Sequence, residues 1–142
     1  MNSHSRALFV LLGALLFLLA GTGIYYFFRS PIIAFELFHI TPKEYIAGDT
    51  NNPFIYFMVF CLPDALWYMA LLLTQTLFFN EKGWLNRILI GVAISLPFLL
   101  ETGQYFGFVS GTFDWFDTLT YCLTLIIFLC LKKVSFFSPY KQ

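Results

Sequence analysis

A chain of 142 residues that is 59% hydrophobic and only 11% charged is not an ordinary water-soluble domain, in which about a quarter of the residues are charged. Its 19 Phe, 8 Tyr and 3 Trp would be hard to bury in a water-soluble core of this size. The net charge of zero excludes nothing by itself, because the charges are sorted along the chain. The length allows one domain, and the composition predicts a membrane protein with no nucleic-acid partner.

The first apolar run, Ala7 to Phe28, is long enough to cross roughly 30 Å of hydrocarbon at about 1.5 Å per residue. A signal peptide is the alternative, because Arg6 precedes a Leu-rich stretch. The run is longer than the roughly 7–15 apolar residues of a typical signal, and no A-x-A cleavage site interrupts it. We therefore expect a retained helix over residues 7–28.

Residues 29–62 are predicted to form an outer loop with short interfacial helices. Ser30-Pro31 is typical of a helix start and opens an apolar segment. Thr41-Pro42-Lys43-Glu44 has the form of a capping box, which favours another helical turn. Residues 54–62 would lead into the second span as an interfacial or kinked segment.

The remaining apolar runs predict three more spans, over residues 63–79, 85–106 and 113–131. Pro63 is expected in the first turn of the second span, where proline is tolerated, with Asp64 beside it. Pro97 is expected to kink the third span. The chain is thus predicted to be a single membrane domain over residues 1–142 with an all-α fold, an integral membrane four-helix bundle.

Basic residues are unevenly divided between the two sides that four spans define. On the side opposite the termini, the only basic residues are Arg29 and Lys43. The same side holds every acidic residue except Glu81. Because basic residues concentrate in cytoplasmic loops, both termini are predicted to be cytoplasmic in a multi-pass protein of the cell membrane. Six of the eight basic residues lie on the side of the termini: Arg6, Lys82, Arg87, Lys132, Lys133 and Lys141.

Several polar residues are predicted to meet near the outer surface as a candidate polar pocket. They close the first and third spans or open the second and fourth, so all lie at one membrane depth. Residues three apart share a helix face. Glu101 and Gln104 are therefore expected on one face of the third span, and Asp114 and Asp117 on one face of the fourth. In chain order the members are Arg29, Asp64, Glu101, Gln104, Asp114 and Asp117.

The members of the pocket differ in how well an ordinary structural role explains them. Acids in the first turn of a helix are stabilised by its dipole, which suits Asp64 and the Asp114/Asp117 pair. Arg29 suits a helix end or reaches the headgroups. Glu101 lies inside an apolar run, where an ionised side chain costs roughly 2.5–3.5 kcal/mol at mid-membrane. Glu101 is therefore the leading functional candidate, with a structural hydrogen bond as the alternative.

Close carboxylates in such a pocket constrain one another. At about 5 Å they repel by about 3 kcal/mol at an effective dielectric of about 20, so one would hold a proton or a cation would bridge them. Arg29 offers a cation, and Ca²⁺ or Mg²⁺ accepts oxygen ligands of this kind. No ligand spacing fixes a geometry, so no metal site is predicted and the cofactor stays open. The cysteines show no C-x-x-C spacing and are interpreted as small apolar core residues: Cys61, Cys122 and Cys130.

Two further patterns concern packing at the same edge. Gly103-x-x-x-Gly107 is a small-x-x-x-small pattern that lets helices approach closely, although Gly107 and Gly111 could serve the turn alone. Aromatic residues near the outer surface are typical of an interfacial belt. The predicted members of this belt are Trp67, Tyr68, Tyr105 and Trp115.

Glu101-x-x-Gln104 at the end of one span and Asp114-x-x-Asp117 at the start of the next resemble the VanZ-like membrane proteins. Their pattern pairs E-x-x-Q with D-x-x-D across a short outer turn, and Asp64 is similar to the aspartate that opens their corresponding helix. The resemblance covers about residues 60–131. The chain departs from it at Gly111 and Tyr121, where members commonly have Arg and often Asn. The family name derives from glycopeptide (teicoplanin) resistance, so the resemblance implies a cell-envelope role without an established chemistry.

Two functional hypotheses follow from these residues. In the first, the outer pocket binds a polar or lipid-linked envelope component, a lipid or glycan precursor; a catalytic version would use Glu101 as general acid or base. In the second, the protein is a non-enzymatic scaffold or partner subunit whose acids only stabilise helix packing. Transport by a single copy has less support, because no inverted repeat is visible. The lipid bilayer is the predicted surrounding, and the oligomeric state stays open.

Overall fold

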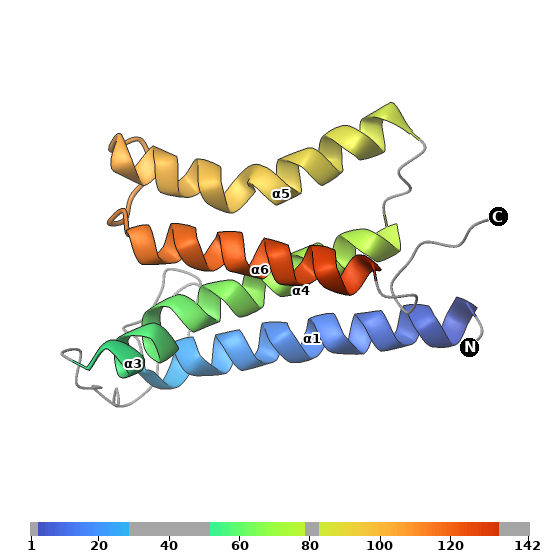
Figure 1. The fold of residues 1–142 in the computed structure, drawn as a ribbon, viewed down its shortest axis with the longest axis horizontal. Coiled ribbons are helices and arrows are strands. Elements are labelled where there is room, and N and C mark those ends of the chain that lie inside the picture. The colour runs from blue at the N-terminus through green and yellow to red at the C-terminus, as the bar shows by residue number, and fades with distance from the viewer. Residues whose placement is uncertain (1–2, 29–51, 79–82, 134–142) are drawn as a thin grey trace.

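The structure is a computed structural model, and it describes residues 3–28, 52–78 and 83–133. Four helical segments in these ranges are each long and apolar enough to cross a membrane: His4–Phe28, Pro53–Leu77, Trp84–Tyr105 and Trp115–Lys133. They lie side by side, and the start of α1 and the end of α6 are at the same end of the bundle (Figure 1). The predicted all-α four-helix membrane bundle is confirmed, and the protein is a multi-pass membrane protein.

The first helix, α1, spans Ser3–Phe28 and is apolar around most of its circumference. Only a narrow stripe, which includes Val10, Ala14 and Tyr25, is buried in the bundle. A helix that is apolar on every side suits a lipid environment, because lipid can cover the faces that protein does not. The interfacial helices expected in the first outer loop fall largely on residues 29–51, outside the described residues.

The second span differs from the expectation that it restarts at Pro63. It is helical from Pro53 onward, as α3 (Pro53–Tyr56), the π-helical segment η1 (Phe57–Cys61) and α4 (Leu62–Phe78). Asn52 begins it, because its side-chain oxygen accepts a hydrogen bond of 3.0 Å from the Phe54 N–H and Pro53 takes the first helical position. The span therefore starts ten residues earlier than predicted, within the range assigned to the interfacial loop.

The π-helical segment explains how Pro63 fits inside this span. Proline has no N–H to donate, and its ring clashes with the carbonyl four residues earlier in a regular α-helix. In η1 the Leu62 N–H instead bonds the Phe57 carbonyl, five residues back, which widens the turn just before Pro63. Pro63 is consequently an internal residue of a distorted helix and not its first turn.

The third span, α5 (Trp84–Tyr105), contains Pro97 and bends midway along its length (Figure 1). Pro97 cannot donate to the carbonyl of residue 93, and this loss is an identifiable cause of a helix bend. The Tyr68 hydroxyl of α4 donates a hydrogen bond of 2.8 Å to the Ile94 carbonyl, one turn before the proline. A side chain of α4 thus binds the α5 backbone at the bend.

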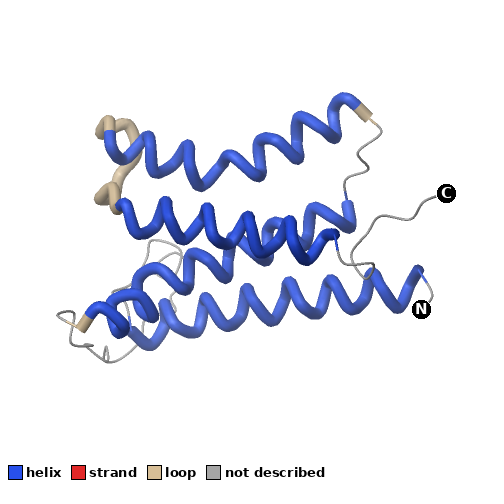
Figure 2. The backbone as a smooth tube through the Cα atoms, in the orientation of Figure 1, coloured by secondary structure: helices blue, strands red, loops and turns tan. Residues whose placement is uncertain are grey.

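The connection from α5 to α6 is short and closed by backbone hydrogen bonds; it is the described loop at one end of the tube in Figure 2. Phe108 N–H bonds the Gly103 carbonyl at 2.8 Å, and Gly107 N–H bonds the Gln104 carbonyl at 3.0 Å. With Gly107 at φ 73°, this is a Schellman motif. Helix α6 (Trp115–Lys133) follows and ends with Lys132 and Lys133, which suit its negative C-terminus.

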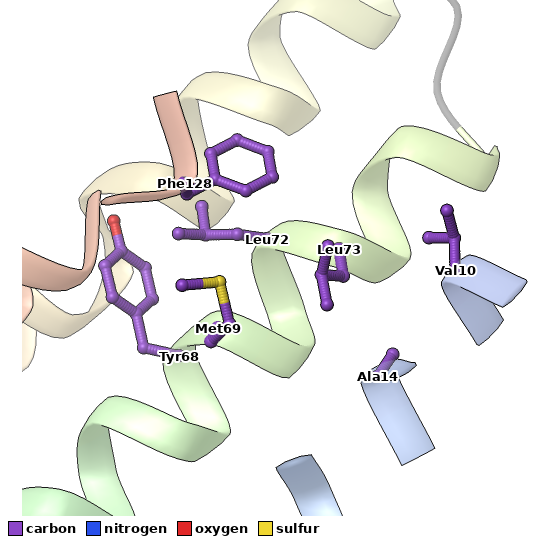
Figure 3. Packing of buried hydrophobic residues seen from close by; sticks show 7 residues of the cluster. All are labelled: Val10, Ala14, Tyr68, Met69, Leu72, Leu73 and Phe128. Carbon is purple, nitrogen blue, oxygen red and sulfur yellow. The ribbon is translucent and has the colours of Figure 1, made fainter. Parts of the chain in front are cut away.

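Helix α4 occupies the centre of the bundle, with its most extensive contacts to α1 and then to α6. Leu72, which is fully buried, lies beside Phe128 of α6, whereas Leu73 lies on the side of α1 (Figure 3). Lipid is as apolar as leucine, so dispersion contacts between close-packed side chains hold such a core together. The members of this core are Val10, Ala14, Tyr68, Met69, Leu72, Leu73 and Phe128.

Among the described residues, the glycine that lets two spans approach closely lies between α1 and α4 and not in the predicted Gly103-x-x-x-Gly107 pattern. A Cβ at Gly21 would lie 2.7 Å from the Trp67 ring and 3.0 Å from the Pro63 carbonyl oxygen. A Cβ at Gly103 would meet Val109, in the turn that follows its own helix. The Gly103 and Gly107 positions therefore serve the helix end, and Gly21 allows the close approach of two spans.

Candidate functional site

Charged side chains are sorted to opposite ends of the bundle. The described acidic residues lie at the end where α1 finishes and α6 begins: Asp64, Glu101, Asp114 and Asp117. The described Arg and Lys residues lie at the other end: Arg6, Arg87, Lys132 and Lys133. The structure therefore brings these four acids together at one end of the bundle.

Glu101 lies in the half of α5 that follows Pro97 and is 6% exposed, so its carboxylate does not face the surrounding lipid. Its Oε2 accepts a hydrogen bond from the Asp114 backbone N–H at 3.4 Å. That distance is long for an N–H···O bond, whose usual range is about 2.7–3.2 Å. One long hydrogen bond offsets little of the free-energy cost of burying a carboxylate, so helix stability alone does not account for Glu101 at this position.

Asp114 has two structural tasks at the start of α6. Its Oδ1 accepts a hydrogen bond of 2.8 Å from the Phe116 N–H, which makes Asp114 the N-cap of the helix. Its Oδ2 accepts a hydrogen bond of 2.5 Å from the Tyr56 hydroxyl of α3. The helix-capping explanation therefore accounts for one oxygen of Asp114, and a contact with the second span accounts for the other.

Asp64 is bound to the first span. Its Oδ1 accepts a hydrogen bond of 2.7 Å from the hydroxyl of Tyr25, which is itself buried. The Tyr25 ring stacks on Trp67, with centroids 4.6 Å apart and planes 11° from parallel. Since α3, η1 and α4 form one helical run, Asp64 does not cap a free helix end; it joins α4 to α1.

Asp117, in the first turn of α6, is half-buried and has one unsatisfied oxygen. Its Oδ1 is buried without a hydrogen-bond partner among the described residues, and so is Thr118 Oγ1 beside it. The Cys61 thiol lies near the Asp117 carboxylate. Burial of a polar atom without a partner costs free energy, so these two oxygens are places where a donor would be stabilising.

The four carboxyl groups form one electrostatic cluster, which we call the acidic cluster: Asp64, Glu101, Asp114 and Asp117. The charges of Asp64 and Asp114 act on Glu101, and those of Asp64, Asp114 and Glu101 act on Asp117. In the described part of the chain, no group of three or more His, Cys, Asp or Glu is arranged to hold a metal ion. The four acids of the cluster are nonetheless close enough to influence one another electrostatically.

The other two predicted pocket members have different outcomes. Gln104 is half-buried, and its side-chain amide packs against Gly111, where a Cβ would lie 2.7 Å from Nε2. Gly111 also has φ 135°, so a side chain at this position is disfavoured on two grounds. The space that a side chain at position 111 would need is thus filled by the Gln104 amide. Arg29 lies outside the described residues.

The sequence prediction missed the side chains that contact the acids. Tyr25 donates a hydrogen bond to Asp64, and Tyr56 donates one to Asp114. Cys61 lies near Asp117, and Tyr121 interacts electrostatically with Asp64, Asp117 and Glu101. The sequence around these side chains is rich in aromatic residues, so local spacing did not single them out. The one available signal was their position at the same end of the spans as the acids, which applies to Tyr25, Tyr56 and Cys61.

The expected aromatic belt is divided between two environments. Tyr68 is buried at 3% exposure and Trp67 stacks inside the bundle, so neither belongs to an interfacial belt. Tyr105 and Trp115 are well exposed, and both rings contact Phe113 between them. Of the four residues predicted for the belt, the two that are well exposed therefore flank the α5–α6 connection.

The fold and the acidic cluster define a class: a four-span helical membrane protein with carboxylates from three spans gathered at one end. A comparison with protein-family models finds no match, and searches among characterised proteins and solved structures find none either. The resemblance to VanZ-like proteins therefore remains a hypothesis based on the two four-residue motifs and Asp64.

Proposed function

We propose that the protein is a VanZ-like protein of the cell membrane that binds a polar or lipid-linked cell-envelope component at the acidic cluster. The observation that carries the proposal is the burial of Glu101, at 6% exposure, within the electrostatic influence of Asp64 and Asp114. An acid in this position is costly for a membrane helix, and such acids typically mark binding or transport sites.

The chemistry of the described side chains favours a ligand that donates hydrogen bonds. Ionised carboxylates accept only, and the buried Asp117 Oδ1 has no donor among the described residues. Hydroxyl groups or an ammonium group on a lipid or glycan precursor would supply such donors. A phosphate group would instead need a cation, for which Arg29 is the candidate in the protein.

The orientation belongs to the same proposal. The described Arg and Lys residues lie at the end that holds the start of α1 and the end of α6. The positive-inside rule assigns this end to the cytoplasm and the acidic cluster to the outer side, where envelope precursors are used. A reporter enzyme fused after the last residue tests this: activity of a cytoplasm-only reporter supports it, and activity of a periplasm-only reporter rejects it.

The function is tested by Glu101→Gln, which removes the charge and keeps the shape. In a host whose teicoplanin susceptibility changes when the protein is produced, Glu101→Gln is expected to abolish that change at unchanged protein level. Thr102→Ala is the matched control, because Thr102 is exposed and its hydroxyl bonds only the Phe98 carbonyl of its own helix. Wild-type behaviour of Glu101→Gln at normal protein level would reject the proposal.

A second candidate function is a non-enzymatic scaffold or partner subunit. It is favoured by the hydrogen bonds that join spans through the acids, Tyr25 to Asp64 and Tyr56 to Asp114. If the acids only stabilise packing, Glu101→Gln lowers the thermal stability in detergent and any phenotype falls in proportion to protein level. A phenotype lost without a loss of stability separates binding from this alternative.

A further inference from the structure

The second span changes its winding just before the residues that join the acidic cluster. In η1 (Phe57–Cys61) the Leu62 N–H bonds the Phe57 carbonyl, five residues back, whereas a regular α-helix uses the carbonyl four residues back. A turn of this kind contains one residue more than an α-turn. The residues before η1 are therefore rotated about the helix axis by one residue's share, about 100°, relative to a span that is α-helical throughout.

This rotation decides which aromatic residue of the second span faces α6. Cys61 is buried and lies near Asp117 of α6. In a continuous α-helix the residues four and seven positions before Cys61 would share its face, and these are Phe57 and Phe54. Both are exposed instead, at 40% and 70%. The place on that face is taken by Tyr56, five positions before Cys61.

Two contacts put the Tyr56 side chain against the start of α6. Its hydroxyl donates the 2.5 Å hydrogen bond to Asp114 Oδ2, and its ring lies edge-on to Phe116 at 6.2 Å. The helix start at Pro53 sets how far along the bundle Tyr56 lies, and η1 sets the direction in which its ring points. With Phe57 in this place, Asp114 Oδ2 would lose its hydroxyl donor.

The hydrogen bond of Tyr56 also bears on Glu101, because Asp114 contacts both. Asp114 Oδ1 accepts from the Phe116 N–H, Oδ2 accepts from the Tyr56 hydroxyl, and the Asp114 N–H donates to Glu101 Oε2. Tyr56 and Phe116 therefore hold both side-chain oxygens of the residue whose backbone contacts the buried acid. Asp114 thus connects the second, third and fourth spans at the acidic cluster.

From these contacts we infer that η1 sets the register of the acidic cluster: its extra residue places Tyr56 where Phe57 would otherwise lie, and Tyr56 is a positioning residue for Asp114 and, through the Asp114 N–H, for Glu101. Single π-helical turns inside α-helices occur frequently at functional sites. The use of this positioning, to hold the carboxylate that a ligand meets, rests on the proposed function. The register itself does not.

The register is tested by exchanging the two residues, Tyr56→Phe together with Phe57→Tyr, which keeps the composition of the helix. Unfolding of the full-length protein is followed in mixed micelles by titration with sodium dodecyl sulfate. The exchange is expected to raise the equilibrium constant of unfolding about tenfold to a hundredfold, as Tyr56→Phe alone does, because a hydrogen bond to a charged group is lost. Phe57→Tyr alone is the matched control and should leave the constant unchanged.

Deletion of Met58 tests the extra residue itself. Met58 is 38% exposed, and its removal leaves Tyr56 four positions before Cys61, so a regular α-turn keeps the tyrosine on the face toward α6. Tyr56→Phe is therefore expected to raise the unfolding constant of the Met58-deleted protein by the same factor. The inference is overturned if the exchange variant is as stable as the unsubstituted protein, or if Tyr56→Phe has no effect after the deletion. Should the Met58-deleted protein fail to fold, the exchange and its control decide alone.

The positioning role is tested by teicoplanin susceptibility in the host used for Glu101→Gln. Tyr56→Phe should weaken the phenotype by more than its protein level explains, whereas Leu72→Ala, in the core beside Phe128, should weaken it only in proportion to protein level. A Tyr56→Phe phenotype that only follows protein level, beside an inactive Glu101→Gln, would reject the positioning role and leave the proposed function standing. A normal Glu101→Gln phenotype would reject the proposed function and leave the register, which unfolding measures, untouched.

Discussion

The hydroxyl of Tyr56 in α3 donates a hydrogen bond of 2.5 Å to Asp114 Oδ2 at the start of α6, which joins the start of the second span to the start of the fourth. Both residues are half-buried, and the Tyr56 ring also lies edge-on to Phe116 at 6.2 Å. The contact exists only because the second span begins at Pro53, so the early helix start is what brings this tyrosine to the acidic cluster.

Tyr56→Phe is expected to lower the free energy of unfolding by about 1.5–3 kcal/mol, the usual contribution of a hydrogen bond to a charged group. The ring and its aromatic contacts are kept, so the hydroxyl is the only loss. Thermal unfolding in detergent measures the effect. Tyr105→Phe is the control, because Tyr105 is 64% exposed, and a loss of stability as large in the control would contradict the assignment.

Gly21→Ala is expected to destabilise the α1–α4 contact by about 1–3 kcal/mol, the cost of overpacking. The added Cβ would lie 2.7 Å from the Trp67 ring, and that ring is held by its stacking on Tyr25. Gly23→Ala has open space and should be neutral or slightly stabilising, since alanine favours a helix by about 1 kcal/mol over glycine. Equal unfolding temperatures for the two variants would show that the contact is not tight.

Leu72→Ala is expected to cost about 2–5 kcal/mol, because it leaves a cavity at a fully buried position between α4 and α6. Leu99→Ala is the matched control. Leu99 is 59% exposed, so lipid or detergent replaces the lost methyl groups and little stability is lost. Urea or thermal unfolding in one detergent compares the two variants. A similar loss of unfolding free energy at both positions would contradict the assignment of Leu72 to the core.

Gly107→Ala is expected to cost about 1–2 kcal/mol, because Gly107 has φ 73° and a side chain disfavours that conformation. No atom lies within 4 Å of an added Cβ there, so the cost is one of backbone strain alone. Gly91→Ala, in the middle of α5 with equally open surroundings, should show no such cost. Comparing the free energies of unfolding of the two variants measures the backbone strain. A Gly107→Ala variant as stable as the unsubstituted protein would contradict the prediction.

The fold could be predicted because apolar runs of this length leave few alternatives in a chain with so few charges. The depth of the four acids could be predicted for the same reason, since antiparallel spans return to the same side. The start of the second span could not, because a proline such as Pro63 is compatible both with a first turn and with a distorted interior. The helix start is instead set by Asn52, which caps the helix, and by Pro53, which takes its first position.

The neighbours of each acid were beyond the reach of the sequence. Which face of one span meets which face of the next depends on packing, and local spacing does not report it. The Gly103-x-x-x-Gly107 pattern looked suited to helix contact and instead ends a helix, while Gly21, which stands in no such pattern, admits Trp67. For the same reason Tyr25, Tyr56 and Cys61 could not be assigned to the acids.

The central place of α4 has a consequence for how the protein is made. Its most extensive contact is with α1, and both of these spans leave the ribosome before α5 and α6. This hairpin can therefore assemble in the bilayer while the rest of the chain is still being synthesised. Helix α6 then covers another side of α4, and α5 is the described span with the least protein around it.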